Sequence, residues 1–186
     1  NHSATHLLHE ALREVLGSHV EQKGSFVSDE VLRFDFAHFA KVEPEQLRAV
    51  ERIVAARIRA CIPLQEYREV PIDEAREMGA MALFGEKYGS EVRVVTIGDG
   101  FDRELCGGTH VPTTGHIGRV TVLGEGSVAS GVRRIEALVG TGAYEFQSKE
   151  HALVSQLSQL VGGRVDELPE RIESLLAKLR ESEKKL

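Results

Sequence analysis

The 186-residue sequence contains only two cysteines, Cys61 and Cys106, which is too few for a disulfide framework. We therefore expect a reducing, cytoplasmic environment. No apolar run approaches the roughly 20 residues of a membrane span, and the polar first residues lack the form of a signal peptide, so we expect no association with a membrane. The formal net charge of −6 argues against broad, nonspecific binding of nucleic acid, although it does not exclude a local basic surface.

Hydrophobic residues make up 41% of the sequence, enough to bury a core, and the length suits one compact domain with an appendage. Helical periodicity and strand-like alternation are interspersed, and the strands come in adjacent groups rather than in strict β-α-β order. The predicted helices cover residues 3–16 and 44–60, with a short one starting at 73, and the predicted strands cover 31–36, 63–72, 91–97, 116–127 and 131–140. This order favours an α+β fold with a mostly antiparallel sheet and packed helices.

The last part of the chain has a different pattern. A helix is predicted over 141–161, the glycines at 162 and 163 break it, and a second helix follows Pro169. Apolar residues in the second helix follow a heptad rhythm, so we expect a helical hairpin or a coiled-coil-like tail that self-associates. We place the boundary between a globular domain, residues 1–145, and this tail, residues 146–186.

Two pairs of side chains have the spacing of metal ligands. His2 and His6 lie four residues apart on the first predicted helix, and Cys106 and His110 flank a loop that begins with two glycines. Because zinc prefers histidine nitrogen and cysteine sulfur in a tetrahedral arrangement, the two pairs together predict one zinc site. The spacing leaves two questions open: whether the histidines are only surface residues and Cys106 a core thiol, and whether a bound zinc would be structural or catalytic.

Four segments in collinear order resemble the editing domain of alanyl-tRNA synthetases. They read NHSATHLLHEALREVLG from residue 1, QKGSFVSDEVLRFDF from 22, ELCGGTHV from 104 and GVRRIEALVG from 131. The resemblance covers about residues 1–145. The related editing domain of threonyl-tRNA synthetases is the nearest rival, but its cysteine loop usually reads like CRGPH, and the CGGTH of this sequence is similar to the alanyl type.

The resemblance implies a zinc-dependent hydrolase that removes wrongly attached serine or glycine from tRNA(Ala). A synthetic pocket for alanine cannot strongly reject either amino acid, so a second site must remove the errors. By the match of motifs, the zinc ligands correspond to His2, His6, Cys106 and His110. Thr5 and Gln22 match positions of the substrate pocket, where a hydroxyl and an amide suit a small polar side chain. We expect an ordered water to attack the ester while zinc orients the aminoacyl group or stabilises the oxyanion.

The expected partners are the acceptor end of tRNA(Ala) and the remainder of a synthetase chain. Arg133 and Arg134 would project to opposite faces of a strand, and we expect one of them to contact the RNA. The absence of a starting methionine and the helical tail favour an excised segment of a synthetase over a freestanding trans-editing protein. Two other functions stay open: a zinc-stabilised module that binds the acceptor end without hydrolysis, and an interaction module that acts through its tail.

Overall fold

The computed structural model describes residues 1–82, 87–98 and 100–185. It contains two compact units, Asn1–Ala143 and Tyr144–Leu186. The elements of the first unit are α1 (His2–Leu16), β1 (Gln22–Val27), β2 (Leu32–Ala37), α2 (Pro44–Arg59), β3 (Leu64–Pro71), α3 (Ile72–Glu77), β4 (Glu91–Ile97), β5 (Asp102–Leu105), the short 3-10 helix η1 (Thr114–Ile117), β6 (Val120–Ala129) and β7 (Val132–Val139).

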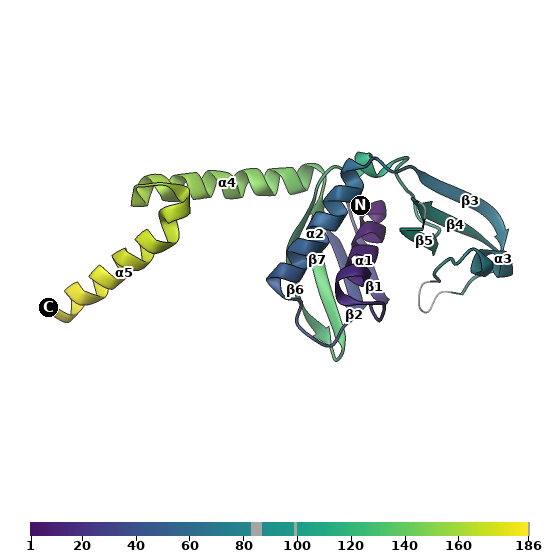
Figure 1. Cartoon of the computed structure of the whole chain (residues 1–186), viewed down its shortest axis with the longest axis horizontal. Helices are drawn as coiled ribbons and strands as arrows, with labels where there is room; N and C mark the ends of the chain where they lie inside the picture. The colour runs from purple at the N-terminus through teal and green to yellow at the C-terminus, as the bar shows by residue number, and fades with distance from the viewer. Residues whose placement is uncertain (83–86, 99, 186) are drawn as a thin grey trace. The chain divides into compact units, whose positions relative to one another are not determined.

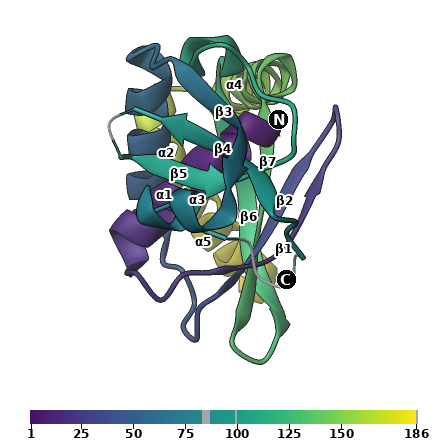
Figure 2. The ribbon, with the colours of Figure 1, turned by 90° about the vertical axis from the view of Figure 1, so that its right-hand side faces the viewer.

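The strands form two antiparallel sheets rather than one. The larger sheet has the order β1-β2-β7-β6, and the smaller one has the order β3-β4-β5. Helix α1 lies between the two sheets, beside α2 (Figures 1 and 2). The predicted α+β fold with antiparallel pairing is therefore confirmed, with the strands divided between two layers.

The core lies between the larger sheet and the two helices. The apolar stripe of α1 buries Leu7, Leu8 and Leu12 against the inner face of β2, where Phe34 and Phe36 are also fully buried. Burying each such side chain contributes about 1.5–3 kcal/mol, so this layer holds α1 firmly in place. The helix ends at Gly17, whose φ of 121° suits a residue without a Cβ.

Two strands that bear on the site, β1 and β5, were not recognised in the sequence. Strand β1 pairs with β2 through a turn in which Ser28 accepts a hydrogen bond from the Val31 backbone N–H at 3.0 Å. Most of β1 is exposed, so it lacks the apolar alternation that marks a strand. Strand β5 is only four residues long, and two of its buried residues are acidic, a composition unfavourable for strands.

The second unit is helical, as the sequence predicts. Helix α4 (Thr141–Val161) begins in the first unit and ends before Gly162 and Gly163, both with positive φ; η2 (Val165–Glu167) and α5 (Leu168–Lys185) follow. Several large apolar side chains of these helices are exposed: Leu153, Leu157, Leu160, Ile172, Leu175, Leu176 and Leu179. No helix in the described part of the chain combines the length and the apolar character needed to cross a membrane.

Candidate metal centre and adjoining cavity

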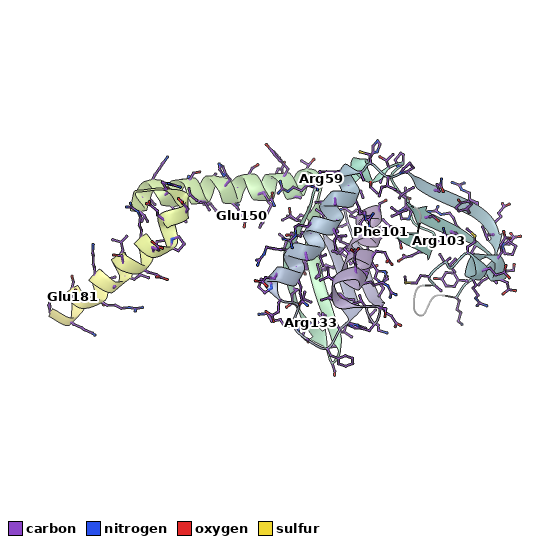
Figure 3. All side chains as sticks on the ribbon, in the orientation of Figure 1. Arg59, Phe101, Arg103, Arg133, Glu150 and Glu181 are labelled. Carbon is purple, nitrogen blue, oxygen red and sulfur yellow. The ribbon has the colours of Figure 1, made fainter. Side chains whose placement is uncertain are left out.

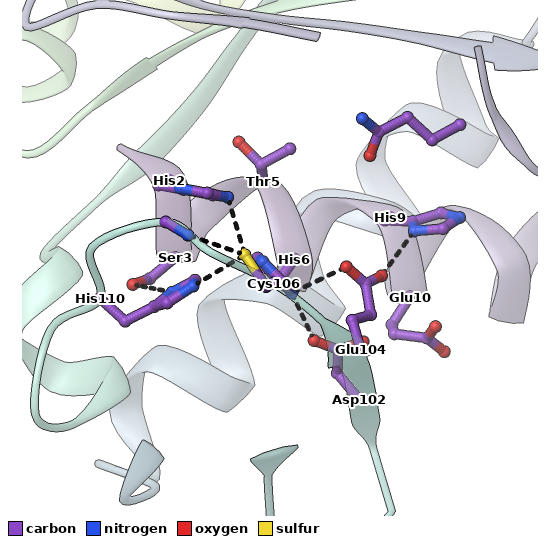
Figure 4. A network of polar contacts seen from close by, with 12 residues as sticks. His2, Ser3, Thr5, His6, His9, Glu10, Asp102, Glu104, Cys106 and His110 are labelled. Atoms are coloured by element: carbon purple, nitrogen blue, oxygen red, sulfur yellow. Dashed lines mark hydrogen bonds and ion pairs between the residues drawn. The ribbon is translucent and has the colours of Figure 1, made fainter. Parts of the chain in front are cut away.

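The four predicted metal ligands come together in space. His2 and His6 project from the first turns of α1, and the loop after β5 brings Cys106 and His110 against them (Figure 4). The Cys106 Sγ lies 3.4 Å from His2 Nε2 and 3.3 Å from His110 Nε2. One ligand atom from each of the four residues lies within 4.8 Å of the others.

This cluster has the dimensions of a tetrahedral zinc site. Zinc–sulfur and zinc–nitrogen bonds of ordinary length separate neighbouring ligand atoms by about 3.5 Å, close to the separations around Cys106. The Nε2 atoms of His2 and His110 face the sulfur, as needed for both to share one ion with it. The donor set therefore fits zinc in type, number and spacing.

Hydrogen bonds shift the pKa values of Cys106 and His6 in the cluster. Burial alone raises the pKa of the Cys106 thiol, but hydrogen bonds from the three histidines outweigh burial and lower the pKa to about 4. Burial alone lowers the pKa of His6, but its hydrogen bonds to Asp102 and Cys106 raise the pKa to about 10. Burial also raises the pKa of Asp102, and the hydrogen bond from His6 partly offsets that effect. The metal-free site therefore favours a thiolate beside a protonated His6.

Residues around the cluster orient the ligand rings. The Nδ1 of His6 lies 2.7 Å from Asp102 Oδ2 and 3.0 Å from Glu104 Oε2. The Nδ1 of His110 lies 3.0 Å from the Ser3 Oγ, which also accepts a hydrogen bond from the Val111 backbone N–H. Such partners keep the proton on Nδ1 and leave Nε2 for the metal.

The loop that carries Cys106 is held by hydrogen bonds from Arg93 and packs closely against the ring of His2. The Arg93 guanidinium donates to the Cys106 carbonyl oxygen at 2.9 Å and also to the Gly108 carbonyl oxygen. A Cβ on Gly108 would overlap the ring of His2, whereas a Cβ on Gly107 would meet no atom within 4 Å. Only the second glycine is therefore required by the close approach of the loop to α1.

A cavity of about 330 Å³ adjoins the cluster. Thr5 and Gln22, the predicted pocket residues, both line it. Gln22 approaches from β1, and its side-chain amide donates to the Ser25 Oγ at 3.3 Å. The remaining lining residues are His2, His6, His9, Ser25, Glu104, Cys106, Gly107 and Gly108. The structure thus joins the metal cluster and the predicted pocket in one site.

Arg133 and Arg134 do not line this cavity. They lie on β7 in the larger sheet, where Arg133 is labelled in Figure 3. Arg133 donates to both carboxylate oxygens of Glu125, at 2.6 and 2.9 Å, and Arg134 forms a similar pair with Asp35 at 2.7 and 2.9 Å. The hydrogen bonds and charge of Asp35 raise the pKa of Arg134. Both arginines are engaged in ion pairs within the sheet, and a role for either in RNA binding stays a prediction.

Several residues of the site were not anticipated from the sequence. His9 had a usable signal, because positions 2, 5, 6 and 9 of a helix lie on one face. Ser3, Arg93, Asp102 and Glu104 had none, because their contacts with the metal ligands or the loop depend on the tertiary fold.

Comparison with known families supports the resemblance seen in the sequence. Residues 92–136, which include β5 and the cysteine loop, match the family described as the threonyl and alanyl tRNA synthetase second additional domain. The match is therefore to a domain whose description names two aminoacyl-tRNA synthetases.

The similar curated proteins are alanine–tRNA ligases. The chain is 57% identical over 181 residues to the alanine–tRNA ligase of Porphyromonas gingivalis, covering 97% of this chain and 20% of the relative. It is 61% identical over 161 residues to that of Parabacteroides distasonis, covering 87% of this chain and 18% of the relative. It is 51% identical over 186 residues to that of Pseudomonas fluorescens, covering 100% of this chain and 21% of the relative.

These matches confirm the resemblance to alanyl-tRNA synthetases over the whole chain. The chain spans about a fifth of the length of these curated relatives.

Proposed function

We propose that the first unit is a zinc-dependent editing domain, which hydrolyses the ester bond of seryl- and glycyl-tRNA(Ala). The observation that carries this proposal is the cluster of His2, His6, Cys106 and His110 beside a cavity of about 330 Å³. The match of residues 92–136 to a domain shared by threonyl and alanyl tRNA synthetases supports it independently.

The cavity suits a small polar aminoacyl group. The Thr5 hydroxyl and the Gln22 amide are both able to donate and accept hydrogen bonds with a serine hydroxyl. A site that hydrogen-bonds a substrate hydroxyl discriminates against an analogue without it, because its polar groups are then left unpaired. Alanine lacks that hydroxyl, and this difference gives the site a basis for preferring the seryl ester over the alanyl ester; the glycyl ester also lacks the hydroxyl and gains nothing from this contact.

Residues around the cluster orient the rings of two metal ligands, His6 and His110, for the proposed hydrolysis. Zinc held by the four ligands would supply a positive charge that orients the aminoacyl group or stabilises the oxyanion. Asp102 and Glu104 hold the proton on His6 Nδ1, and Ser3 orients the ring of His110. These contacts fix the ligand geometry before substrate arrives, which lowers the reorganisation needed during the reaction.

The candidate nucleophiles in the site are poorly placed for covalent catalysis, so we infer that water attacks the ester. The Cys106 sulfur is surrounded by its fellow ligands. The Ser3 Oγ is engaged by His110 and by the Val111 backbone N–H. The Ser25 Oγ accepts a hydrogen bond from Gln22, and among the described residues no histidine or carboxylate is hydrogen-bonded to it as a general base.

We further propose that the chain works within a longer synthetase in the cytoplasm, with the acceptor end of tRNA(Ala) as its partner. The relatives named alanine–tRNA ligase, of which the chain spans about a fifth, support this arrangement. Residues 1–145 would form the editing domain, and residues 146–186 would form the connector to the rest of the synthetase. A freestanding trans-editing protein is the alternative.

The test compares hydrolysis of seryl-, glycyl- and alanyl-tRNA(Ala) by zinc-loaded and chelator-treated protein. Faster, metal-dependent hydrolysis of the seryl and glycyl esters is expected. Equal rates before and after complete removal of zinc would refute the metal dependence. Binding of tRNA(Ala) without hydrolysis by the zinc-loaded protein would instead favour the acceptor-end binding module.

A further inference from the structure

His9 is a buried histidine at the edge of the cavity for which the proposed chemistry has no role so far. It lies on the same face of α1 as Thr5 and His6, and it lines the cavity with them. Its side chain is only 2% exposed, and its ring also packs against Phe34 at 5.2 Å between centroids. A polar ring in this position needs partners for both of its nitrogen atoms.

One nitrogen of His9 has a partner and the other has none. The Nδ1 lies 3.0 Å from Glu104 Oε1, at the end of the contact marked in Figure 4. A carboxylate only accepts hydrogen bonds, so the proton between them belongs to Nδ1, and in the tautomer with its single proton there the Nε2 presents a lone pair. That Nε2 is buried and has no hydrogen-bond partner among the described residues.

The carboxylate of Glu104 connects His9 to the metal cluster. Its Oε1 receives His9, while its Oε2 lies 3.0 Å from the Nδ1 of His6. The same carboxylate thus orients a metal ligand and fixes the ring of His9 next to it. The ring of His9 is consequently held in one orientation at the edge of the cavity.

We propose that His9 is a substrate-binding residue whose Nε2 accepts a hydrogen bond from a hydroxyl group of the aminoacylated adenosine. This inference rests on the proposed editing function. Two hydroxyls of the substrate lie close to the ester: the free ribose hydroxyl next to it and the side-chain hydroxyl of serine. Both are O–H donors of the kind that a neutral imidazole nitrogen accepts.

The test combines two variants of the 186-residue, zinc-loaded chain. In His9→Asn the amide nitrogen takes the place of Nδ1 and still donates to Glu104, but the acceptor at Nε2 is gone. In His9→Gln the amide reaches the Nε2 position and supplies an acceptor oxygen. His9→Asn is expected to lower kcat/KM about tenfold, the effect of one lost hydrogen bond, whereas His9→Gln retains most of the activity.

The substrates identify which hydroxyl is bound. Seryl and glycyl esters are compared on tRNA ending in adenosine and on tRNA ending in 2′-deoxyadenosine, with the ester on the 3′ oxygen. A loss in His9→Asn with both adenosine-terminated esters, but not with the deoxyadenosine-terminated glycyl ester, assigns the ribose hydroxyl. A loss confined to the two seryl esters assigns the serine hydroxyl.

Either assignment supports the proposal, and two results overturn it. One is unchanged kcat/KM on every substrate in His9→Asn. The other is an equal loss on every substrate, including the deoxyadenosine-terminated glycyl ester, which has neither hydroxyl. His151→Asn, at an exposed position of α4, is the matched control, and zinc content and thermal melting are measured for each variant. If the unchanged protein hydrolyses none of the esters, the editing function fails, and that result is distinct from failure of the role of His9.

Discussion

Replacement of Asp102 tests whether buried carboxylates position the metal ligand His6. Asp102 is 1% exposed, and its Oδ2 lies 2.7 Å from the Nδ1 of His6. In Asp102→Ala this contact is lost, and the ring keeps only its second carboxylate partner, Glu104, at 3.0 Å. The ring is then less firmly oriented, and its Nε2 becomes a poorer donor to zinc.

The contacts around His6 also set the expected magnitude. Loss of such a partner costs about 10–100-fold in metal affinity. Because Glu104 remains to hold the Nδ1 proton, we expect the lower end of this range for Asp102→Ala, about tenfold, or about 1.4 kcal/mol in the free energy of zinc binding. Asp102→Ala with Glu104→Gln is expected to lower the affinity further, since the ring then has no carboxylate partner from β5.

Zinc affinity is measured by competition with a chromophoric chelator at pH 7, a readout that does not depend on hydrolysis. Asp73→Ala is the matched control, because the Asp73 carboxylate is 88% exposed on α3. Circular dichroism establishes that each variant is folded. Zinc affinity in folded Asp102→Ala equal to that of the unchanged protein would refute the positioning argument, as would an equal decrease in Asp73→Ala.

Three further predictions concern the site and the sheet. The pKa of His6 is raised to about 10 and that of Cys106 is lowered to about 4, so at pH 7 the metal-free protein has a protonated His6 and a Cys106 thiolate. Zinc uptake should therefore release about one proton. Calorimetry in buffers of different ionisation enthalpy measures this release, and zero release would contradict the prediction. Gly108→Ala should lower the free energy of unfolding of the zinc-loaded protein by about 1–3 kcal/mol, because its Cβ would overlap the ring of His2. Gly107→Ala should be tolerated, because its Cβ would meet no atom within 4 Å. Denaturant titration compares the two variants, and equal stability would be inconsistent with the close approach of the loop to α1. If Arg134 contacts a phosphate of tRNA(Ala), Arg134→Glu should weaken binding and reduce the salt dependence of the binding constant by about one counterion. Unchanged affinity across salt concentrations would show that Arg134 lies outside the RNA interface.

The sequence by itself determined the local structure of α1 and the types of ligand available. Apolar residues at helical spacing predict this helix, and the four-residue spacing of His2 and His6 puts both imidazoles on one face of it. The alternation of apolar and charged residues likewise predicts β2, because one face of that strand is buried and the other is not. These properties are readable from the sequence because they depend on residues that are neighbours along the chain.

The tertiary structure alone decided which distant residues surround the predicted metal ligands. Asp102 and His6 are 96 positions apart, and nothing in their local sequence indicates that a short, acidic strand packs against α1. The same holds for Arg134, whose pairing with Asp35 follows from the register between β7 and β2. Long-range contacts depend on how strands and helices pack, and the periodicity of a single segment carries no information about the segment that will lie opposite it.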